Sequence, residues 1–310
     1  MVYVKNNTTI PVPQVFGFSA TPHPGVGCRY ILMESLPGTP GTGRFTEFVP
    51  NDHKKKTFAQ LADIKVQLSK LRFPRIGRLL GGGLTMQESY TIEAFRPVGC
   101  LYSEPCGPFD SAIDYYFSIR RRDLDMAMRD DNSHITQDQR FGAWLRVQAV
   151  PIIVQTEFNH GPFPLHHPDL NIANLMFDDE FNITGVIDWT GAFVAPVECF
   201  CIMPIEFQRY SKNPLHTEIN LIWELMEEAE RQIDSKVPLS KYMKSPRSAG
   251  IPAFEIGDRR GEKITTQLCQ SLIRHMYGDQ AVYNQIKSMF DGSRWMVGLV
   301  ETGDEICESL

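Results

Sequence analysis

The chain has 310 residues with 42% hydrophobic and 22% charged content, and its formal net charge is −6. This length allows one large or two modest globular domains, and the mildly acidic balance gives no reason to expect nucleic-acid or anionic-membrane partners. No secretory signal, membrane-spanning run or Cys-x-x-Cys pair is present, so we expect a soluble cytoplasmic protein without disulfides or structural zinc.

The amino-terminal part of the sequence predicts a pair of strands. The run Ile10-Pro11-Val12-Pro13 cannot be helical, because proline lacks an amide donor and favours extended neighbours. Apolar, β-prone residues then form two runs, at 15–18 and 30–33, separated by a loop rich in proline and glycine. These runs predict two strands that end before Glu34.

Helices dominate the remainder of the sequence. Apolar residues recur every three or four positions between Asp52 and Leu71, which predicts a helix with Asp52 as its N-cap. Residues 76–80 and 90–95 predict a short β hairpin. Similar apolar spacing predicts five further helices, over residues 111–128, 136–150, 215–233, 264–276 and 280–290.

One further β segment, at residues 174–188, interrupts the helices of the carboxyl half. The order of elements therefore predicts an α+β fold with a small β lobe and a larger, mainly helical lobe. The short hairpin would lie at the cleft of the helical lobe.

The segment between His166 and Trp189 carries the most chemical information. His167, Asp169 and Asn174 fit the pattern H-x-D-x-x-x-x-N, and a second apolar run leads to Asp188. Asp169 lies on the loop that enters the hairpin, where its carboxylate can orient an acceptor hydroxyl and accept its proton. The pattern therefore indicates a catalytic base followed by two oxygen-bearing side chains.

The hairpin geometry predicts that these two side chains meet. If the hairpin is centred near Phe181, Asn174 and Asp188 each lie seven positions from the centre and oppose each other. An amide oxygen and a carboxylate suit Mg²⁺, which prefers oxygen ligands and shares them with nucleotide phosphates. We therefore expect a magnesium site at Asn174 and Asp188.

These motifs resemble the aminoglycoside phosphotransferase family of the protein-kinase-like superfamily. The resemblance is carried by His167-Pro168-Asp169, Asn174 and Gly185-Val186-Ile187-Asp188-Trp189. Three flanking segments resemble the fungal branch of that family: Thr9-Ile10-Pro11-Val12-Pro13, Gly161-Pro162-Phe163-Pro164-Leu165 and Pro196-Val197-Glu198.

The resemblance implies a protein-kinase-like fold and a kinase that transfers the γ-phosphate of ATP to a hydroxyl of a small molecule, with Mg²⁺. It implies that Asp169 is the catalytic base, that His167 braces the loop through a backbone contact, and that Asn174 and Asp188 bind the metal. The interlobe hinge, whose backbone would receive the adenine edge, is implied to be Met33, Glu34, Ser35 and Leu36.

The resemblance starts at about the fourth strand of the small lobe. About nine residues precede Ile10, so a glycine-rich strand pair, a strand lysine and a helix glutamate cannot be placed. We therefore expect residues 1–37 to be a remnant of the N-terminal lobe with the hinge, and residues 38–310 to be the helical C-terminal lobe. A catalytically impaired pseudokinase-like binding protein, or a truncated gene product, is the alternative function.

Several other residues favour structural interpretations. The run Gly81-Gly82-Gly83 predicts a turn rather than a phosphate loop, because no Gly-Lys-Ser/Thr follows it. The run Arg120-Arg121-Arg122 predicts a solvated helix face rather than an anion site. We expect Glu198 to brace the catalytic loop and Trp189 to pack beneath the metal site. His166 is assigned no role, and neither the acceptor nor the oligomeric state follows from the sequence.

Overall fold

The computed structural model describes residues 1–81, 90–96, 104–129, 135–202, 216–233, 239–248, 250–256 and 261–291. The chain divides into two compact units. The first unit comprises Met1–Glu93 and Pro162–Ser245, and the second comprises Ala94–Gly161 and Pro246–Leu310. The predicted lobe boundary between residues 37 and 38 stays a prediction.

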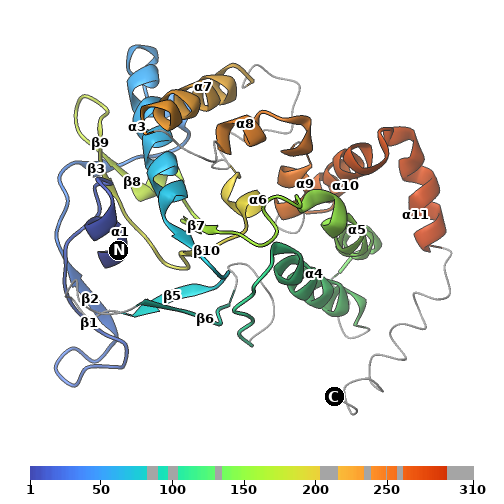
Figure 1. Cartoon of the computed structure of the whole chain (residues 1–310), viewed down its shortest axis with the longest axis horizontal. Coiled ribbons are helices and arrows are strands. Elements are labelled where there is room, and N and C mark those ends of the chain that lie inside the picture. The colour runs from blue at the N-terminus through green and yellow to red at the C-terminus, as the bar shows by residue number, and fades with distance from the viewer. Residues whose placement is uncertain are drawn as a thin grey trace. The chain divides into compact units, whose positions relative to one another are not determined.

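All named strands of the described residues belong to the first unit, where they form four small sheets (Figure 1). Two of these sheets are antiparallel pairs, β1–β2 and β5–β6, and two have three strands, in the orders β3-β8-β9 and β10-β7-β4. The strands are β1 (Val15–Ser19), β2 (Tyr30–Met33), β3 (Thr39–Pro40), β4 (Arg72–Phe73), β5 (Arg78–Gly81), β6 (Tyr90–Glu93), β7 (Phe163–His166), β8 (Leu175–Phe177), β9 (Ile183–Val186) and β10 (Phe193–Val194).

The predicted β1–β2 pair and the hairpin at residues 76–95 are both confirmed. Gly81 ends β5, whereas Gly82 and Gly83 lie outside the described residues. The expectation of a single β segment in the carboxyl half is wrong, because β7 and β10 flank the β8–β9 hairpin. These two strands are short and nearly fully buried, so they lack the alternation that marks a half-exposed strand.

The helices of the first unit are centred on α3, which runs beside α7 and the β8–β9 hairpin (Figure 1). The predicted apolar face of α3 is buried. Its predicted N-cap is wrong: Pro50 is the N-cap, and Asp52 lies in the first turn, where its charge suits the helix dipole. The helices are α1 (Val2–Asn7), α2 (Phe45–Phe48), α3 (Asn51–Lys70), η1 (Ile172–Asn174), α6 (Val197–Phe200), α7 (His216–Gln232) and α8 (Leu239–Met243).

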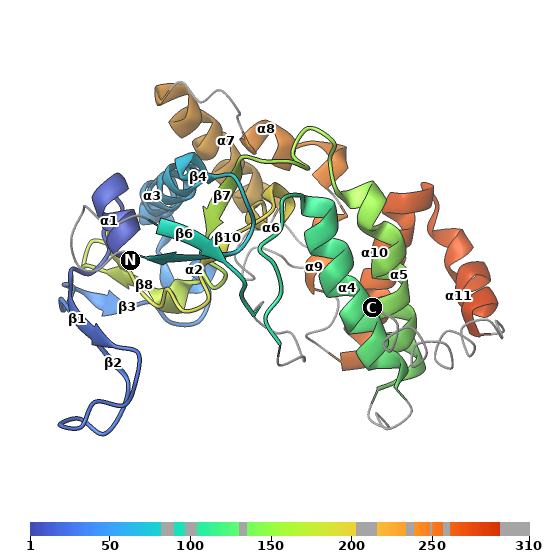
Figure 2. The same ribbon diagram turned by 60° about the horizontal axis from the view of Figure 1, so that its bottom comes forward.

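The second unit is helical, with α5 packed between α4 and α10 (Figure 2). Two of its helices begin at side-chain caps: Ser111 accepts from the Asp114 amide, and Thr136 forms a capping box with Gln139. The elements are α4 (Ala112–Met128), α5 (Gln137–Ile153), η3 (Pro246–Ser248), α9 (Ile251–Ile256), α10 (Gly261–Tyr277), η4 (Gln280–Val282) and α11 (Tyr283–Asp291).

The five helices predicted after residue 110 are all present within a few residues, except that 280–290 divides into η4 and α11. The predicted solvated face of the arginine run is wrong for Arg120. This side chain is 7% exposed, pairs with Asp123 at 3.1 Å and Glu255 at 2.9 Å, and lies over the Phe254 ring. In contrast, Arg121 is exposed beside Asp125. Glu255 and Phe254 belong to α9, so Arg120 is buried by a helix that is distant in the sequence.

The α+β class is confirmed by this mixture of helices and strands. Within the part of the chain that the structure describes, none of the helices has the length and apolar character needed to cross a membrane.

Candidate active site

The catalytic motif follows a strand held on both sides. Strand β7 pairs with β4 through Phe163 and Pro164 and with β10 through Leu165 and His166. The His166 ring meets the rings of Phe193 and Phe200 edge to face, and burial lowers its pKa well below the ordinary value. His166 therefore packs as a neutral side chain. The catalytic loop, residues 167–174, begins directly after this buried strand residue.

His167 connects the catalytic loop to the end of the hairpin. Its Nε2 donates to the Ile187 carbonyl at 3.0 Å, and its Nδ1 accepts from the Asp169 amide at 3.3 Å. Burial lowers the pKa of His167, while the carboxylates of Asp169 and Asp188 act in the opposite direction. A neutral ring with its proton on Nε2 satisfies both contacts. The expected backbone contact of His167 is therefore present.

Trp189 packs against this histidine. Its ring lies edge to face with the His167 ring at a centroid distance of 4.8 Å, and its Nε1 donates to the Val186 carbonyl at 3.0 Å. The indole thus supports the turn that carries Asp188, as expected for an aromatic side chain with a satisfied N–H.

Both carboxylate oxygens of Asp169 accept side-chain amides. Asn171 Nδ2 donates to Oδ1 at 2.6 Å, and Asn174 Nδ2 donates to Oδ2 at 3.0 Å. Asn174 also donates to the Asp169 carbonyl at 2.8 Å. The Asp169 side chain is exposed, so its remaining lone pairs face solvent and are open to an acceptor hydroxyl.

The predicted direct opposition of Asn174 and Asp188 is wrong by one residue. The Ile187 amide donates to the Asn174 carbonyl at 2.9 Å, so Ile187 is opposite Asn174. The turn is centred on Glu180 and not on Phe181, because Phe177 pairs with Ile183. Met176 pairs with Gly185, so Thr184 is an extra residue, and it moves the register back by one residue toward the predicted one.

Asp188 follows that register with a left-handed backbone, φ 53°, which redirects the chain immediately after β9. Its Oδ1 accepts from the Thr190 amide at 3.3 Å. The carboxylate remains close enough to influence the pKa of His167, as Asp169 does. Asp169 and Asp188 therefore approach the same imidazole from the two ends of the motif.

The side-chain oxygens of Asn174 and Asp188 suit a hard cation. The amide nitrogen of Asn174 is used on Asp169, and among the described residues its Oδ1 and the Oδ2 of Asp188 accept no hydrogen bond. The described residues hold no group of three or more His, Cys, Asp or Glu side chains that could bind a metal by themselves. Such a donor set fits Mg²⁺ that takes further ligands from phosphate and water.

The predicted hinge lies against the hairpin. Met33 ends β2, and Leu36 packs on Gly185, where an added Cβ would lie 2.4 Å from Leu36 Cδ1. The next residue, Pro37, accepts a hydrogen bond from Thr184 Oγ1 at 2.6 Å. The hinge segment is therefore attached to β9, the strand that leads to Asp188.

Glu34 ties the start of the hinge segment to β1 and α1. Its carboxylate accepts from the Gln14 amide at 2.9 Å and pairs with Lys5 at 3.4 Å. The Gln14 amide, with a smaller contribution from Lys5, lowers the pKa of Glu34. The predicted site residues Met33 to Leu36 therefore have structural contacts on both sides, and their role toward adenine stays a prediction.

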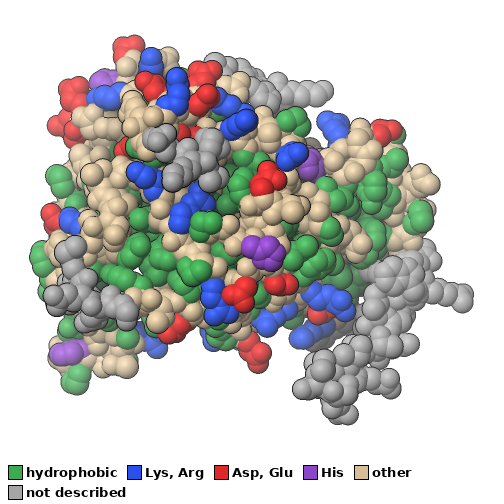
Figure 3. Space-filling model, in the orientation of Figure 1, with side chains coloured by type: hydrophobic (Ala, Val, Ile, Leu, Met, Phe, Trp, Pro, Cys, Tyr) green, Lys and Arg blue, Asp and Glu red, His purple; other side chains and the backbone are tan. Residues whose placement is uncertain are grey.

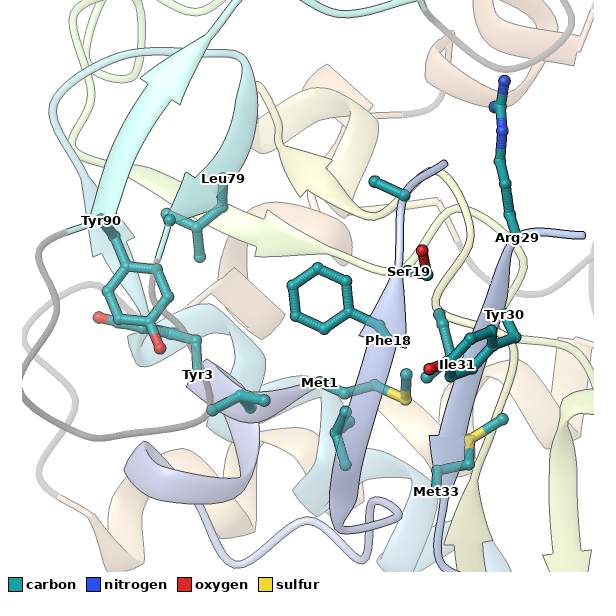
Figure 4. Close-up of a pocket in the computed structure, with 14 residues that line it drawn as sticks. Met1, Tyr3, Phe18, Ser19, Arg29, Tyr30, Ile31, Met33, Leu79 and Tyr90 are labelled. Atoms are coloured by element: carbon teal, nitrogen blue, oxygen red, sulfur yellow. The ribbon is translucent and has the colours of Figure 1, made fainter. Parts of the chain in front are cut away.

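A cavity of about 750 Å³ lies on a different part of the first unit (Figure 4). It is lined by α1 and by the β1–β2 and β5–β6 pairs, with Tyr3 and Tyr90 packed edge to face at 4.7 Å on one wall. Met33 is the one predicted site residue among its lining residues. The catalytic loop and the cavity are therefore separate features.

Asn171 is the polar contact of Asp169 that motif reasoning left out. Its signal was available, because an Asn side chain often accepts the backbone amide two residues further along the chain. The side chain accepts from the Ala173 amide at 2.9 Å while it donates to Asp169.

Comparison with known proteins shows which family the chain resembles over most of its length. Residues 3–199, more than half of the chain, match the family model described as "Phosphotransferase enzyme family". Subtelomeric hrmA-associated cluster proteins from two strains of Aspergillus fumigatus are 23% identical over 253 residues, with 63% of this chain and 49% of each relative covered. The chain therefore spans about half the length of these relatives.

Solved phosphotransferase structures show distant likeness. A type VIII aminoglycoside-3'-phosphotransferase matches with a TM-score of 0.44 and 15% identity, covering 82% of this chain and 77% of that one. A thermostable mutant of an aminoglycoside phosphotransferase, in ternary complex with AMP-PNP and hygromycin B, matches with a TM-score of 0.45 and 14% identity, covering 89% and 82%.

Proposed function

Because the chain belongs to the phosphotransferase enzyme family, we propose that it is a kinase that transfers the γ-phosphate of ATP to a hydroxyl of a small molecule. In this proposal Asp169 is the base, His167 braces the loop, and Asn174 and Asp188 hold Mg²⁺. ATP and Mg²⁺ are the cofactors, and the expected setting is the cytoplasm, without a nucleic-acid or membrane partner.

The arrangement of Asp169 carries the proposal. Its carboxylate is exposed, and amide donors on Oδ1 at 2.6 Å and on Oδ2 at 3.0 Å fix its direction. A carboxylate held in this way can accept the proton of an incoming hydroxyl as the oxygen attacks phosphorus. Positioning supplies most of the catalysis in phosphoryl transfer, so fixed direction matters more than basicity.

Asn174 and Asp188, the two proposed metal ligands, would act on the phosphates of the nucleotide. Mg²⁺ bound there would supply charge neutralisation for the phosphate oxygens of ATP. Asn174 would contribute to both functions, because its nitrogen donates to the proposed base and its oxygen would bind the cation. The neutral His167 keeps a second positive charge away from the two carboxylates.

The hinge residues would bind the adenine edge through their backbone. Met33 ends β2, and Glu34, Ser35 and Leu36 lead from it toward β3, which pairs with β8 of the hairpin. The segment therefore connects the strand pair to the proposed metal site over a few residues, which supports an adenine position next to the phosphates.

The test is phosphate transfer from γ-labelled Mg²⁺·ATP, with water and hygromycin B as acceptors. We expect Asp169→Asn to reduce turnover by about 10²- to 10⁴-fold while the melting temperature and nucleotide affinity hold. Asp178→Asn is the matched control, because Asp178 accepts from Asn182 at the far end of the hairpin. Equal turnover in the Asp169→Asn variant and the unmutated chain would refute the assigned base.

The β1–β2 sheet favours a second candidate, a catalytically impaired pseudokinase-like binding protein. In the described residues this sheet has two strands only, and Phe18, Ile31 and Leu32 are more than half exposed on it. A sheet of two strands has little stability of its own, so it would hold a nucleotide beneath it only weakly. Calorimetry separates the candidates: micromolar binding of Mg²⁺·ATP removes the second, and no binding at millimolar nucleotide removes the first.

A further inference from the structure

Asn171 makes two side-chain hydrogen bonds of different kinds. Its Oδ1 accepts from the Ala173 amide at 2.9 Å and thereby caps η1, the 3₁₀ turn that ends at Asn174. Its Nδ2 donates to Asp169 Oδ1 at 2.6 Å. The first contact stabilises the loop backbone, whereas the second acts on the side chain of the proposed base.

The contact with Asp169 restricts how the carboxylate can turn. Asn174 holds Oδ2 from one side, so with Asn171 on Oδ1 both oxygens are fixed. With Asn174 alone, the side chain could turn about its Cα–Cβ and Cβ–Cγ bonds and remain bonded through either oxygen. Asn171 is therefore the group that removes this rotation.

The chain contains a matched pair elsewhere. At the far end of the same hairpin, Asn182 Nδ2 donates to Asp178 Oδ2 at 2.8 Å, and both asparagines are half-buried. Asp178 also accepts the amides of Glu180 and Asn182, so this pair holds a turn. An Asn-to-Asp side-chain hydrogen bond is therefore present both at the proposed base and away from it.

We propose that Asn171 is a positioning residue for phosphoryl transfer, which fixes the direction of Asp169 toward the acceptor hydroxyl. This inference rests on the proposed function, because it gives Asp169 the role of base. Asn171 does not contact the reacting atoms, and its action passes entirely through the Asp169 carboxylate.

The decisive variant is Asn171→Asp. An aspartate keeps the oxygen that caps Ala173 but replaces the amide donor with a second carboxylate oxygen, which repels Asp169. We expect kcat to fall by about 10- to 100-fold while KM for ATP and the melting temperature stay unchanged. Asn182→Asp is the control and should leave kcat unchanged.

A second readout does not need activity. Side-chain NMR couplings of Asp169, assigned with Asp169→Asn, report whether the carboxylate-bearing side chain occupies one rotamer. We expect one rotamer in the unmutated chain and in Asn182→Asp, and rotamer averaging in Asn171→Asp. Asn171→Gln, which restores the donor on a longer side chain, should recover part of the single-rotamer population.

The kinetic and NMR measurements distinguish a wrong positioning role for Asn171 from a wrong kinase reaction. If the unmutated chain transfers no phosphate but Asp169 becomes averaged in Asn171→Asp, the positioning contact stands and the proposed kinase reaction falls. If Asp169 keeps one rotamer in Asn171→Asp, or if kcat there equals that of an active unmutated chain, the positioning role is wrong.

Discussion

Two antiparallel strand pairs of the first unit, β8–β9 and β1–β2, differ in what covers them. In β8–β9 the apolar side chains Leu175, Phe177 and Val186 are at most 2% exposed. In β1–β2, Phe18 and Leu32 are 55% and 58% exposed, and hydrophobic side chains reach the surface beside this sheet (Figure 3). A strand-forming pattern therefore specifies strands, but packing partners decide their stability.

The covering of β8–β9 comes from three directions. Helix α3 holds its turn through Thr57 Oγ1, which donates to the Phe181 carbonyl at 2.9 Å, and through Gln60, which accepts from the Ile183 amide at 2.9 Å. Phe45 and Phe48 of α2 contact the Phe177 ring, and β3 pairs with β8. The strands between the two proposed metal ligands are therefore held by contacts with α2, α3 and β3.

The largest expected effect is on the core of the covered hairpin. Phe177→Ala removes a buried ring between α2 and β9, so the free energy of unfolding should fall by about 3–5 kcal/mol. Phe18→Ala, the same change on the open sheet, should cost less than about 1 kcal/mol. Urea unfolding of both variants measures the contrast, and similar losses would show that β1–β2 is covered in solution.

A buried charge on α3 gives a pH-dependent test of the covered region. Lys65 Nζ donates to the carbonyls of Phe200 and Ile202 at 3.0 and 3.1 Å, and burial lowers the pKa of Lys65 to about 8. The folded chain therefore releases this proton near pH 8, whereas the unfolded chain keeps it until about pH 10.5.

Between these values the unfolded state binds more protons, so the Lys65 contribution to stability rises with pH, by up to about 3 kcal/mol. At pH 7 the full cost of burying the cation is present. Lys65→Met should remove this rise, which urea unfolding of both chains at pH 7, 8.5 and 10 detects. Parallel curves for the two chains would mean that water reaches Lys65 in the folded state.

Two glycines with positive φ, one beside each strand pair, allow the cost of an added Cβ to be compared between the two regions. Gly38, φ 95°, lies where an added Cβ would be 2.3 Å from the Phe177 carbonyl oxygen, whereas Gly27, φ 77°, in the β1–β2 loop has no atom within 4 Å. Gly38→Ala should cost about 1–3 kcal/mol and Gly27→Ala less, because only the first adds a clash to the strain. Equal losses of melting temperature would show that strain alone matters.

The smallest expected effect concerns the exposed face itself. Leu32→Lys replaces a side chain that is 58% exposed, so the free energy of unfolding should change by no more than about 0.5 kcal/mol. This change in stability is to be compared with the loss expected for Phe177→Ala. A loss above about 2 kcal/mol in urea unfolding would contradict the open state of β1–β2.

Local pattern was sufficient for the motif and for most elements. Asp169, Asn174 and Asp188 were recognisable because a catalytic loop and a hairpin impose fixed spacing, and α3 was recognisable from its apolar period. The register was not recognisable, because the turn is centred on Glu180 and not on Phe181 and because Thr184 is an extra residue. Thr184 contacts Pro37, which is 147 positions away in the sequence.

The sequence by itself determined the α+β class, the helix positions and the set of polar residues that define the proposed site, since these depend on neighbours along the chain. Tertiary structure decided that Arg120 is buried against α9, that Asp169 is held by Asn171 and Asn174, and that β1–β2 stays open. The physical reason is that burial and side-chain direction depend on groups brought together only by folding.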